Sequence, residues 1–194
     1  MIINALLSSS GKSFILGAIL RRVIAKRMKA FWRVRGQPPM SLRTWLFERG
    51  SLTQRVRETC TQSFHIKVLR EYWARPFAEE ARLLKLSPHH CARIREVQLC
   101  CGDRPMVFAR TIMPLDSVQG QLRPLLRLGS QPLGEILFTQ HAHRINAQIC
   151  HLFPHNPLFQ LAITHLKQPP AILWARRSIF ILKNKPLLVQ EIFL

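Results

Sequence analysis

The stretch "CARIREVQLCCGDRPMVFARTIMP", residues 91–114, decides the fold class, because its apolar and polar side chains alternate on both sides of a short turn. The segment "GDRP" between the two halves predicts a hairpin turn. In the first strand Arg95 shares a face with Val97, and in the second Arg110 shares a face with Phe108. We therefore expect an antiparallel pair of strands, each with one arginine on a mainly apolar face.

A second hairpin is predicted at the end of the chain, where "LWARRSIFIL" and "KPLLVQEIFL" meet through the turn residues "KNK". In the last strand Glu191 shares its face with three apolar side chains, Leu187, Val189 and Phe193. A lone carboxylate on such a face is costly unless it has a partner, so Glu191 is a candidate functional residue. The simpler alternative is an exposed terminal strand with its acid in water.

Helices and a further strand region are expected around these hairpins. Helical patterns are found at residues 42–48, 49–58 and 76–86, and in the second half of 122–138. Residues 60–75 predict a strand or two. Ser51 is a suitable N-cap, and Gln54 three residues later completes a capping box. Ser130 is the expected cap of the later helix, with Pro132 near its first position. In residues 141–172 we expect an additional helix or loop.

Residues 1–40 are interpreted as a basic amphipathic arm that precedes a domain at 41–194. Residues 1–36 carry eight Lys and Arg and no acid, and the segment "GQPPM" separates them from the domain. The apolar run "FILGAIL" is far too short to cross a bilayer. One interpretation is a contact with nucleic acid or a weak contact of residues 12–35 with an anionic membrane. The favoured alternative is an accessory helix packed on the domain, and an organelle transit peptide stays open.

Composition limits the class of protein. The 194 residues suit one domain, and 47% hydrophobic content is sufficient for a packed core. With 29 Lys and Arg against 10 Asp and Glu, the formal charge of +19 predicts attraction to polyanions, anionic membranes or small anionic substrates. The five cysteines are Cys60, Cys91, Cys100, Cys101 and Cys150. Their odd number and the absence of a CxxC motif favour reduced thiols in a cytoplasm.

Motifs for metal, nucleotide or acyl-transfer chemistry are not found. Four histidines have spacings that a metal site uses, and these are His141, His143, His151 and His155. No nearby Cys or carboxylate completes a set of ligands, so we expect a solvated loop and no metal. The sequence contains no GxSxG, glycine-rich phosphate loop or HExxH. Buried strand cysteines explain Cys100 and Cys101 more simply than a nucleophile does. Nor is there an RNP-type strand or zinc finger, so specific nucleic-acid binding is not expected.

The remaining unusual residues predict one pocket when they are taken together. Arg95, Arg110 and Glu191 lie on apolar faces, and two predicted helices begin near Leu52 and Leu133, where free backbone N–H groups favour anions. Singly, each feature has an ordinary explanation, because arginines pair with acids or extend to water. Together they describe a small closed pocket that binds an anionic ring at one end and a hydroxyl at the other.

Four ordered blocks resemble the chorismate pyruvate-lyase family over about residues 42–194: "WLFERGSLTQRV", "REVQLCCGDRPMVFARTIMP", "LRLGSQPLGEILF" and "WARRSIF...KPLLVQEIFL". The resemblance implies an α+β fold with a single antiparallel β-sheet flanked by helices and the ligand enclosed beneath helical flaps. It also implies a lyase that converts chorismate to 4-hydroxybenzoate and pyruvate, the first committed step of ubiquinone biosynthesis, without metal or organic cofactor.

The resemblance also assigns roles to individual residues. Arg95 would bind the ring carboxylate with the backbone N–H groups of Leu52 and Leu133, and Glu191 would meet the ring 4-hydroxyl. Arg110 would suit the enolpyruvyl carboxylate. Arg95 and Glu191 are the expected catalytic residues, and whether Glu191 acts as a base or only binds stays open.

The chain also departs from the family pattern. Residues 141–172 look like an insertion, and Ala175 replaces a usual glycine. One rival hypothesis is a non-catalytic small-molecule effector-binding domain, since such domains of transcription regulators resemble this fold; no convincing helix-turn-helix precedes the domain. A third hypothesis is an interaction protein driven by the basic arm, with salt-sensitive binding. We expect a cytoplasmic monomer.

Overall fold

One antiparallel sheet forms the centre of the protein. The computed structural model describes residues 37–194 apart from 165 and 167. Its six strands pair in the order β1-β2-β3-β6-β5-β4, and every neighbouring pair is antiparallel. The strands are β1 (Phe64–Ala74), β2 (Ala92–Cys101), β3 (Arg104–Pro114), β4 (His143–Leu152), β5 (Leu173–Leu182) and β6 (Lys185–Phe193). Both predicted hairpins are confirmed, as is the α+β class with a single antiparallel sheet.

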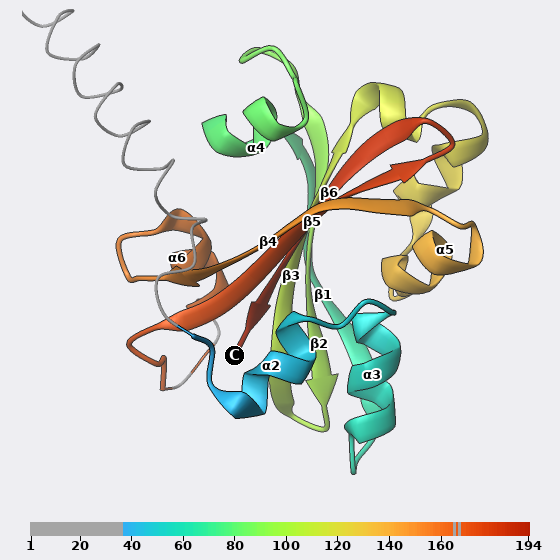
Figure 1. The fold of residues 1–194 in the computed structure, drawn as a ribbon. Coiled ribbons are helices and arrows are strands. Elements are labelled where there is room, and N and C mark those ends of the chain that lie inside the picture. The colour runs from blue at the N-terminus through green and yellow to red at the C-terminus, as the bar shows by residue number, and fades with distance from the viewer. Residues whose placement is uncertain (1–36, 165, 167) are drawn as a thin grey trace, which may run out of the picture.

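Helices cover the two faces of the sheet unequally (Figure 1). One face, called here the pocket face, packs against α2 (Met40–Leu46), α3 (Leu52–Thr59), α5 (Leu133–Thr139) and the 3-10 helices η1 (Leu115–Val118) and η2 (Gly120–Arg127). The opposite face carries α4 (Ala78–Leu83) and α6 (Pro157–Ile163). Because strand side chains alternate, residues next to each other in a strand serve different layers.

The register of β2 against β3 separates the two arginines that the sequence placed on similar faces. At the turn Cys101 lies opposite Arg104, and an uninterrupted ladder from that pair would set Arg95 opposite Arg110. A one-residue register shift near the turn sets Glu96 opposite Arg110 instead. Since a shift of one residue exchanges the two faces, Arg95 lies on the pocket face and Arg110 on the other.

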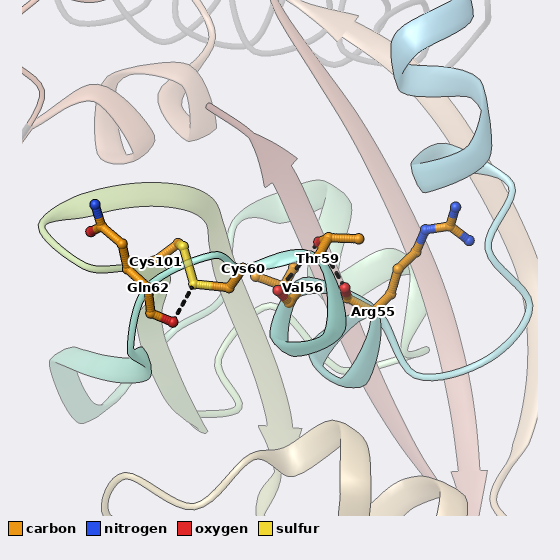
Figure 2. Close-up of a disulfide and its surroundings, with 6 residues drawn as sticks. All are labelled: Arg55, Val56, Thr59, Cys60, Gln62 and Cys101. Atoms are coloured by element: carbon orange, nitrogen blue, oxygen red, sulfur yellow. Dashed lines mark hydrogen bonds between the residues drawn. A yellow bond between two sulfur atoms is a disulfide. The ribbon is translucent and has the colours of Figure 1, made fainter.

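A disulfide joins Cys60 to Cys101, with a Cα–Cα distance of 5.5 Å. It links the residue after α3 to the end of β2 (Figure 2). The expectation that all cysteines are reduced is therefore wrong. Cys100 and Cys101 are neighbours in β2, and neighbouring strand residues point to opposite sides, so only Cys101 meets Cys60. Cys91, Cys100 and Cys150 are free thiols, and burial raises the pKa of Cys100 and Cys150, which argues against a nucleophile.

The helix starts agree only partly with the predicted caps. Ser51 caps α3 as expected, since its Oγ accepts from the backbone N–H of Gln54 at 3.3 Å. The side chain of Gln54 bonds to Glu58, so the second half of the capping box is not made. Ser130 does not cap α5, which follows Pro132 directly.

Residues 141–172 hold more regular structure than the sequence suggested. The additional helix is α6, but the segment also contains β4, one of the two edge strands of the sheet. Its interpretation as an insertion relative to the family stays a prediction. The basic helix within residues 1–36 lies outside the described residues. Within the described ranges, no helix has the length and apolar character needed to cross a bilayer.

Candidate functional site

A pocket lies between the pocket face of the sheet and the first turns of α3 and α5. Its floor is largely apolar and comes from three strands, with Val97, Leu99, Ala109 and Val189 among its members. Four of the five predicted site residues line it together: Leu52, Arg95, Leu133 and Glu191. Arg110 is not among the lining residues. Two further arginines, Arg144 and Arg176, do line the pocket and were not predicted.

Arg95 is fixed in the pocket wall by three acceptors. The side chain is 2% exposed and forms an ion pair with Glu71 of β1. Its Nη1 also donates to the carbonyl of Gly129 at 2.8 Å, and its Nη2 donates to the carbonyl of Gln131 at 3.1 Å. Arg93 also pairs with Glu71, at 3.1 Å, so one carboxylate is shared between two guanidinium groups. Positive charge therefore remains at this end of the pocket for an incoming anion.

The N-termini of α3 and α5 converge above Arg95. A Cβ added to Gly134 would lie 3.2 Å from Thr53 Oγ1 and 3.4 Å from Ser51 Oγ, so a glycine permits this close approach. An ion pair of 2.6 Å between Arg57 and Glu135 also joins the two helices. The first N–H groups of a helix have no acceptor within it, which favours an anion near the start of both helices.

Glu191 is held by Arg176 of the adjacent strand. The two residues are register partners in β5 and β6, and both carboxylate oxygens accept from the guanidinium, Oε2 from Nε and Oε1 from Nη2 at 3.1 Å. The remaining nitrogen, Nη1, donates to the carbonyls of Trp45 at 3.0 Å and Glu48 at 2.9 Å. The carboxylate is therefore oriented, and the acid that the sequence left unpaired has its partner.

The sequence did contain a clue to Arg176. A hairpin through Lys183 and Asn184 counts back to pair residue 176 with Glu191. The neighbouring Arg177 faces the other side of the sheet, where it pairs with Glu79 at 3.0 Å. Adjacent arginines in a strand must serve opposite faces, so one of the two was bound to share a face with Glu191.

Arg144 approaches the same end of the pocket from β4. Its Nε donates to Ser178 Oγ at 2.8 Å, and its Nη1 donates to the carbonyl of Glu48 at 2.7 Å. Burial lowers the pKa of Arg144, and the nearby charge of Arg176 lowers it further. An arginine nevertheless stays protonated at neutral pH, so a second fixed cation stands beside the Glu191 carboxylate. Arg144 was not predicted as a site residue, because residues 141–172 were expected to form a helix or loop and not the strand β4.

Arg110 lies in a buried network under α4, on the opposite face from the pocket. Its Nε donates to Glu80 at 2.8 Å, Nη1 donates to Tyr72 at 3.1 Å, and Nη1 also pairs with Glu96. Burial alone would lower the pKa of Arg110, but the hydrogen bonds and charge of Glu80 raise it. The register shift in the hairpin is the physical reason that the expected ligand role does not fit this position.

The histidines do not form a metal centre in the described part of the chain. No three His, Cys, Asp or Glu side chains gather there as a metal site requires. His143 and His151 belong to β4 and not to a loop, and the ring of His151 lies 3.7 Å from that of Trp174, measured between centroids.

The spacing across the sheet suits one aromatic ring. Arg95 opposes Thr111 in β3, which opposes Val189 in β6, so Glu191 is displaced by two strands sideways and two residues lengthwise. Ideal sheet spacings then separate the Cα atoms of Arg95 and Glu191 by about 12 Å. This span is comparable to a benzoate ring with a para substituent and a hydrogen bond at each end. The pocket can therefore bind a carboxylate at one end and a hydroxyl at the other.

Comparisons with known proteins point in one direction. The model of the chorismate lyase family matches residues 28–194. A probable chorismate pyruvate-lyase of Nitrosomonas europaea is 40% identical over 157 residues, which cover 80% of this chain and 88% of the relative. A protein of the same description from Methylococcus capsulatus is 38% identical and covers 79% and 94%.

Among solved structures, the effector domain of PhnF from Mycobacterium smegmatis has a TM-score of 0.56 at 12% identity, with 76% of this chain and 90% of that one covered. A GntR-family transcriptional regulator from Bacillus cereus has a TM-score of 0.51 at 10% identity and covers 68% and 91%. At such low identity these similarities concern the fold alone.

Proposed function

The chain belongs to the chorismate lyase family, and we propose that its pocket converts chorismate to 4-hydroxybenzoate and pyruvate. The family implies that this product is used for ubiquinone biosynthesis. The observation that carries the proposal is the pairing, in one pocket, of a fixed arginine beneath two helix N-termini with an oriented carboxylate across an apolar floor.

We assign the ring carboxylate of chorismate to Arg95, assisted by the backbone N–H groups of Leu52 and Leu133. The support is that Arg95 is immobilised by two carbonyls and that both helices begin beside it. Glu191 accepts a hydrogen bond from the ring 4-hydroxyl, and Arg176 holds Glu191 in the orientation that this requires. Arg95 and Glu191 are thus the proposed catalytic residues, because they touch the substrate at its two ends.

The reaction requires positioning and charge stabilisation more than added reagents. The C3–O bond breaks with its electron pair on oxygen, the C4 proton is lost, and the C4–H electrons complete the aromatic ring. The released enolpyruvate takes up a proton on its methylene carbon to become pyruvate, so no external oxidant is consumed. Fixed guanidinium groups suit this chemistry, since they hold a dianion and stabilise charge that develops on the departing oxygen.

A direct assay tests the proposed activity. Purified protein is incubated with chorismate, and 4-hydroxybenzoate and pyruvate are followed by chromatography against the spontaneous reaction. We expect both products in equal amounts, and we expect Arg95→Ala to abolish ligand binding and turnover. The matched control is Arg93→Ala, because Arg93 also pairs with Glu71 but does not line the pocket. Folded protein that gives no product above the spontaneous rate would refute the proposal.

The rival function, an effector-binding domain without catalysis, has less support. The regulators resemble this chain at 10–12% identity, whereas the named lyases are 38–40% identical to it. The same assay separates the two functions, because an effector domain would bind a ring carboxylate without releasing pyruvate.

We further propose a cytoplasmic monomer whose residues 12–35 make weak contact with anionic membranes. The cytoplasm is supported by the substrate, a dianion that does not cross a bilayer unaided. There the Cys60–Cys101 disulfide would be exposed to reduction by the thiol pool. Membrane contact is supported by the excess of cations in residues 1–36. Sedimentation with anionic vesicles at low and high salt tests the contact, and size-exclusion chromatography tests the monomer.

A further inference from the structure

Arg144 is the arginine of the pocket that lacks a carboxylate partner. Arg95 pairs with Glu71 and Arg176 pairs with Glu191, but no carboxylate in the described ranges forms an ion pair with Arg144. The side chain is half-buried at the pocket wall. Glu191 and Glu48 lie near enough to act on its charge but form no direct ion pair with it. A partly desolvated guanidinium without a direct ion pair is costly, and a bound anion would relieve that cost.

The contacts of Arg144 fix its guanidinium without neutralising it. Both acceptors are uncharged groups, the hydroxyl of Ser178 at 2.8 Å and the carbonyl of Glu48 at 2.7 Å. The guanidinium also stands 5.9 Å from the centre of the Phe180 ring. No acceptor within the described residues contacts Nη2. The group is therefore held ready for an anion, and the cost of ordering it has already been met by the fold.

The position of Arg144 in the sheet indicates which anion it would meet. The charged residues follow one another across the pocket, with Arg95 on β2, Glu191 on β6, Arg176 on β5 and Arg144 on β4. Arg144 and Arg176 donate to the same carbonyl, that of Glu48, so their guanidinium groups are neighbours. Arg144 thus stands at the end of the pocket where the ring hydroxyl is proposed to bind. In chorismate the carbon next to the hydroxyl-bearing C4 is C3, which carries the enolpyruvyl ether and its carboxylate.

We propose that Arg144 binds the enolpyruvyl carboxylate of chorismate and thereby distinguishes substrate from product. This inference rests on the proposed function, because it assumes the same orientation of the ring. When the C3–O bond breaks, the carboxylate leaves with pyruvate. The remaining 4-hydroxybenzoate has no group for Arg144, so this arginine contributes to substrate binding and not to product binding.

Substitution of Arg144 separates these two affinities. In Arg144→Gln we expect KM for chorismate to rise roughly 10- to 100-fold, the usual effect of losing a charged hydrogen bond, with the dissociation constant of 4-hydroxybenzoate within about twofold. Arg144→Lys should recover part of the loss. Arg123→Gln is the matched control, because it removes the same charge from an exposed site away from the pocket. Steady-state kinetics and isothermal titration calorimetry give the two values.

Two results with Arg144→Gln would overturn the inference. An unchanged KM in Arg144→Gln would remove Arg144 from substrate binding, and an equal loss of 4-hydroxybenzoate affinity would show that it only supports the wall. If the variants do not fold, the wild type answers the question with 3-(carboxymethoxy)-4-hydroxybenzoate, which should bind more tightly than its 3-carbamoylmethoxy amide. Equal affinities would contradict the inference. These titrations need no turnover, so a wild type that binds but does not convert chorismate refutes the proposed activity separately.

Discussion

At the scale of the residue, Glu191 shows how a charged group becomes useful on an apolar face. Arg176 satisfies both of its oxygens from one side, and main-chain carbonyls of α2 and the segment after it hold Arg176 in turn. Desolvation of the carboxylate is thereby offset, and its free lone pairs point into the pocket. A hydroxyl that meets this group encounters an acceptor whose direction is already set.

Glu191→Gln should impair function more than folding. Gln keeps the volume and one acceptor oxygen but removes the charge that pairs with Arg176. We expect the dissociation constant of 4-hydroxybenzoate to rise about tenfold and kcat to fall roughly 10- to 100-fold. The free energy of unfolding in urea should change by only about 1 kcal/mol. Wild-type kcat and affinity in this variant would exclude any role of Glu191 beyond that of a neutral hydrogen-bonding group.

Individual site residues were predictable where one local pattern determined them. Arg95 and Glu191 belong to strands with clear alternation, and Leu52 and Leu133 each begin a helix. Arg110 was misplaced because a single register shift near the hairpin turn exchanges the two faces, and alternation within one strand does not reveal such a shift.

At the scale of the element, α3 is attached to the rest of the protein at its start, its middle and its end. Ser51 caps its start, Arg57 binds Glu135 of α5, and Cys60 after its end is bonded to Cys101. A helix of eight residues has little stability of its own, so its position depends on these links and on the burial of Leu52 and Val56.

Reduction of the disulfide should lower the stability of the protein. Cys60 and Cys101 are 41 residues apart, and loss of a cross-link of that length costs roughly 3–4 kcal/mol in the chain-entropy model. Urea unfolding with and without dithiothreitol measures the difference. Cys60→Ser should resemble the reduced protein and no longer respond to dithiothreitol, whereas Cys91→Ser, at an exposed free thiol, should behave as wild type. A wild type that unfolds at the same urea concentration in both conditions would contradict the cross-link.

Helices and strands were predictable where their apolar residues followed a single helical or strand period. The hairpins and α2, α3, α4 and α5 were expected near their observed positions. Strand β4 was missed because "HRINAQICHL" lacks clean alternation, and a register shift between Ile145 and Gln148 interrupts its pairing with β5. The missed strand carries Arg144, so an error at this scale removed a residue from the predicted site.

At the scale of the whole molecule, the two faces of the sheet have different tasks. The pocket face carries the proposed ligand site, whereas buried ion pairs on the opposite face hold α4 to the sheet through Glu79 and Glu80. Glu80 is bonded to both Arg110 and Gln190, the latter at 2.6 Å. Substitutions on the opposite face should therefore affect stability, and substitutions on the pocket face should affect binding.

Arg110→Met tests this division. Loss of the guanidinium leaves Glu80 and Glu96 buried without their main partner, so we expect the free energy of unfolding to fall by roughly 3–5 kcal/mol. The folded fraction should still bind 4-hydroxybenzoate within about twofold of wild type. Adding Glu80→Gln should restore part of the stability, because one uncompensated charge is removed. If the variant instead lost affinity for 4-hydroxybenzoate while its free energy of unfolding stayed unchanged, Arg110 would be part of the binding site.

The carbonyl of Glu48 has a consequence for how this protein can change over time. Arg144 and Arg176 hold the connection between α2 and α3 through main-chain oxygens, which every amino acid provides. The exposed side chains of Phe47 and Arg49 next to this anchor can therefore be replaced by other residues without breaking these hydrogen bonds. A library randomised at these two positions should retain most of its active members, so the solubility of the protein can be adjusted here by side-chain substitution.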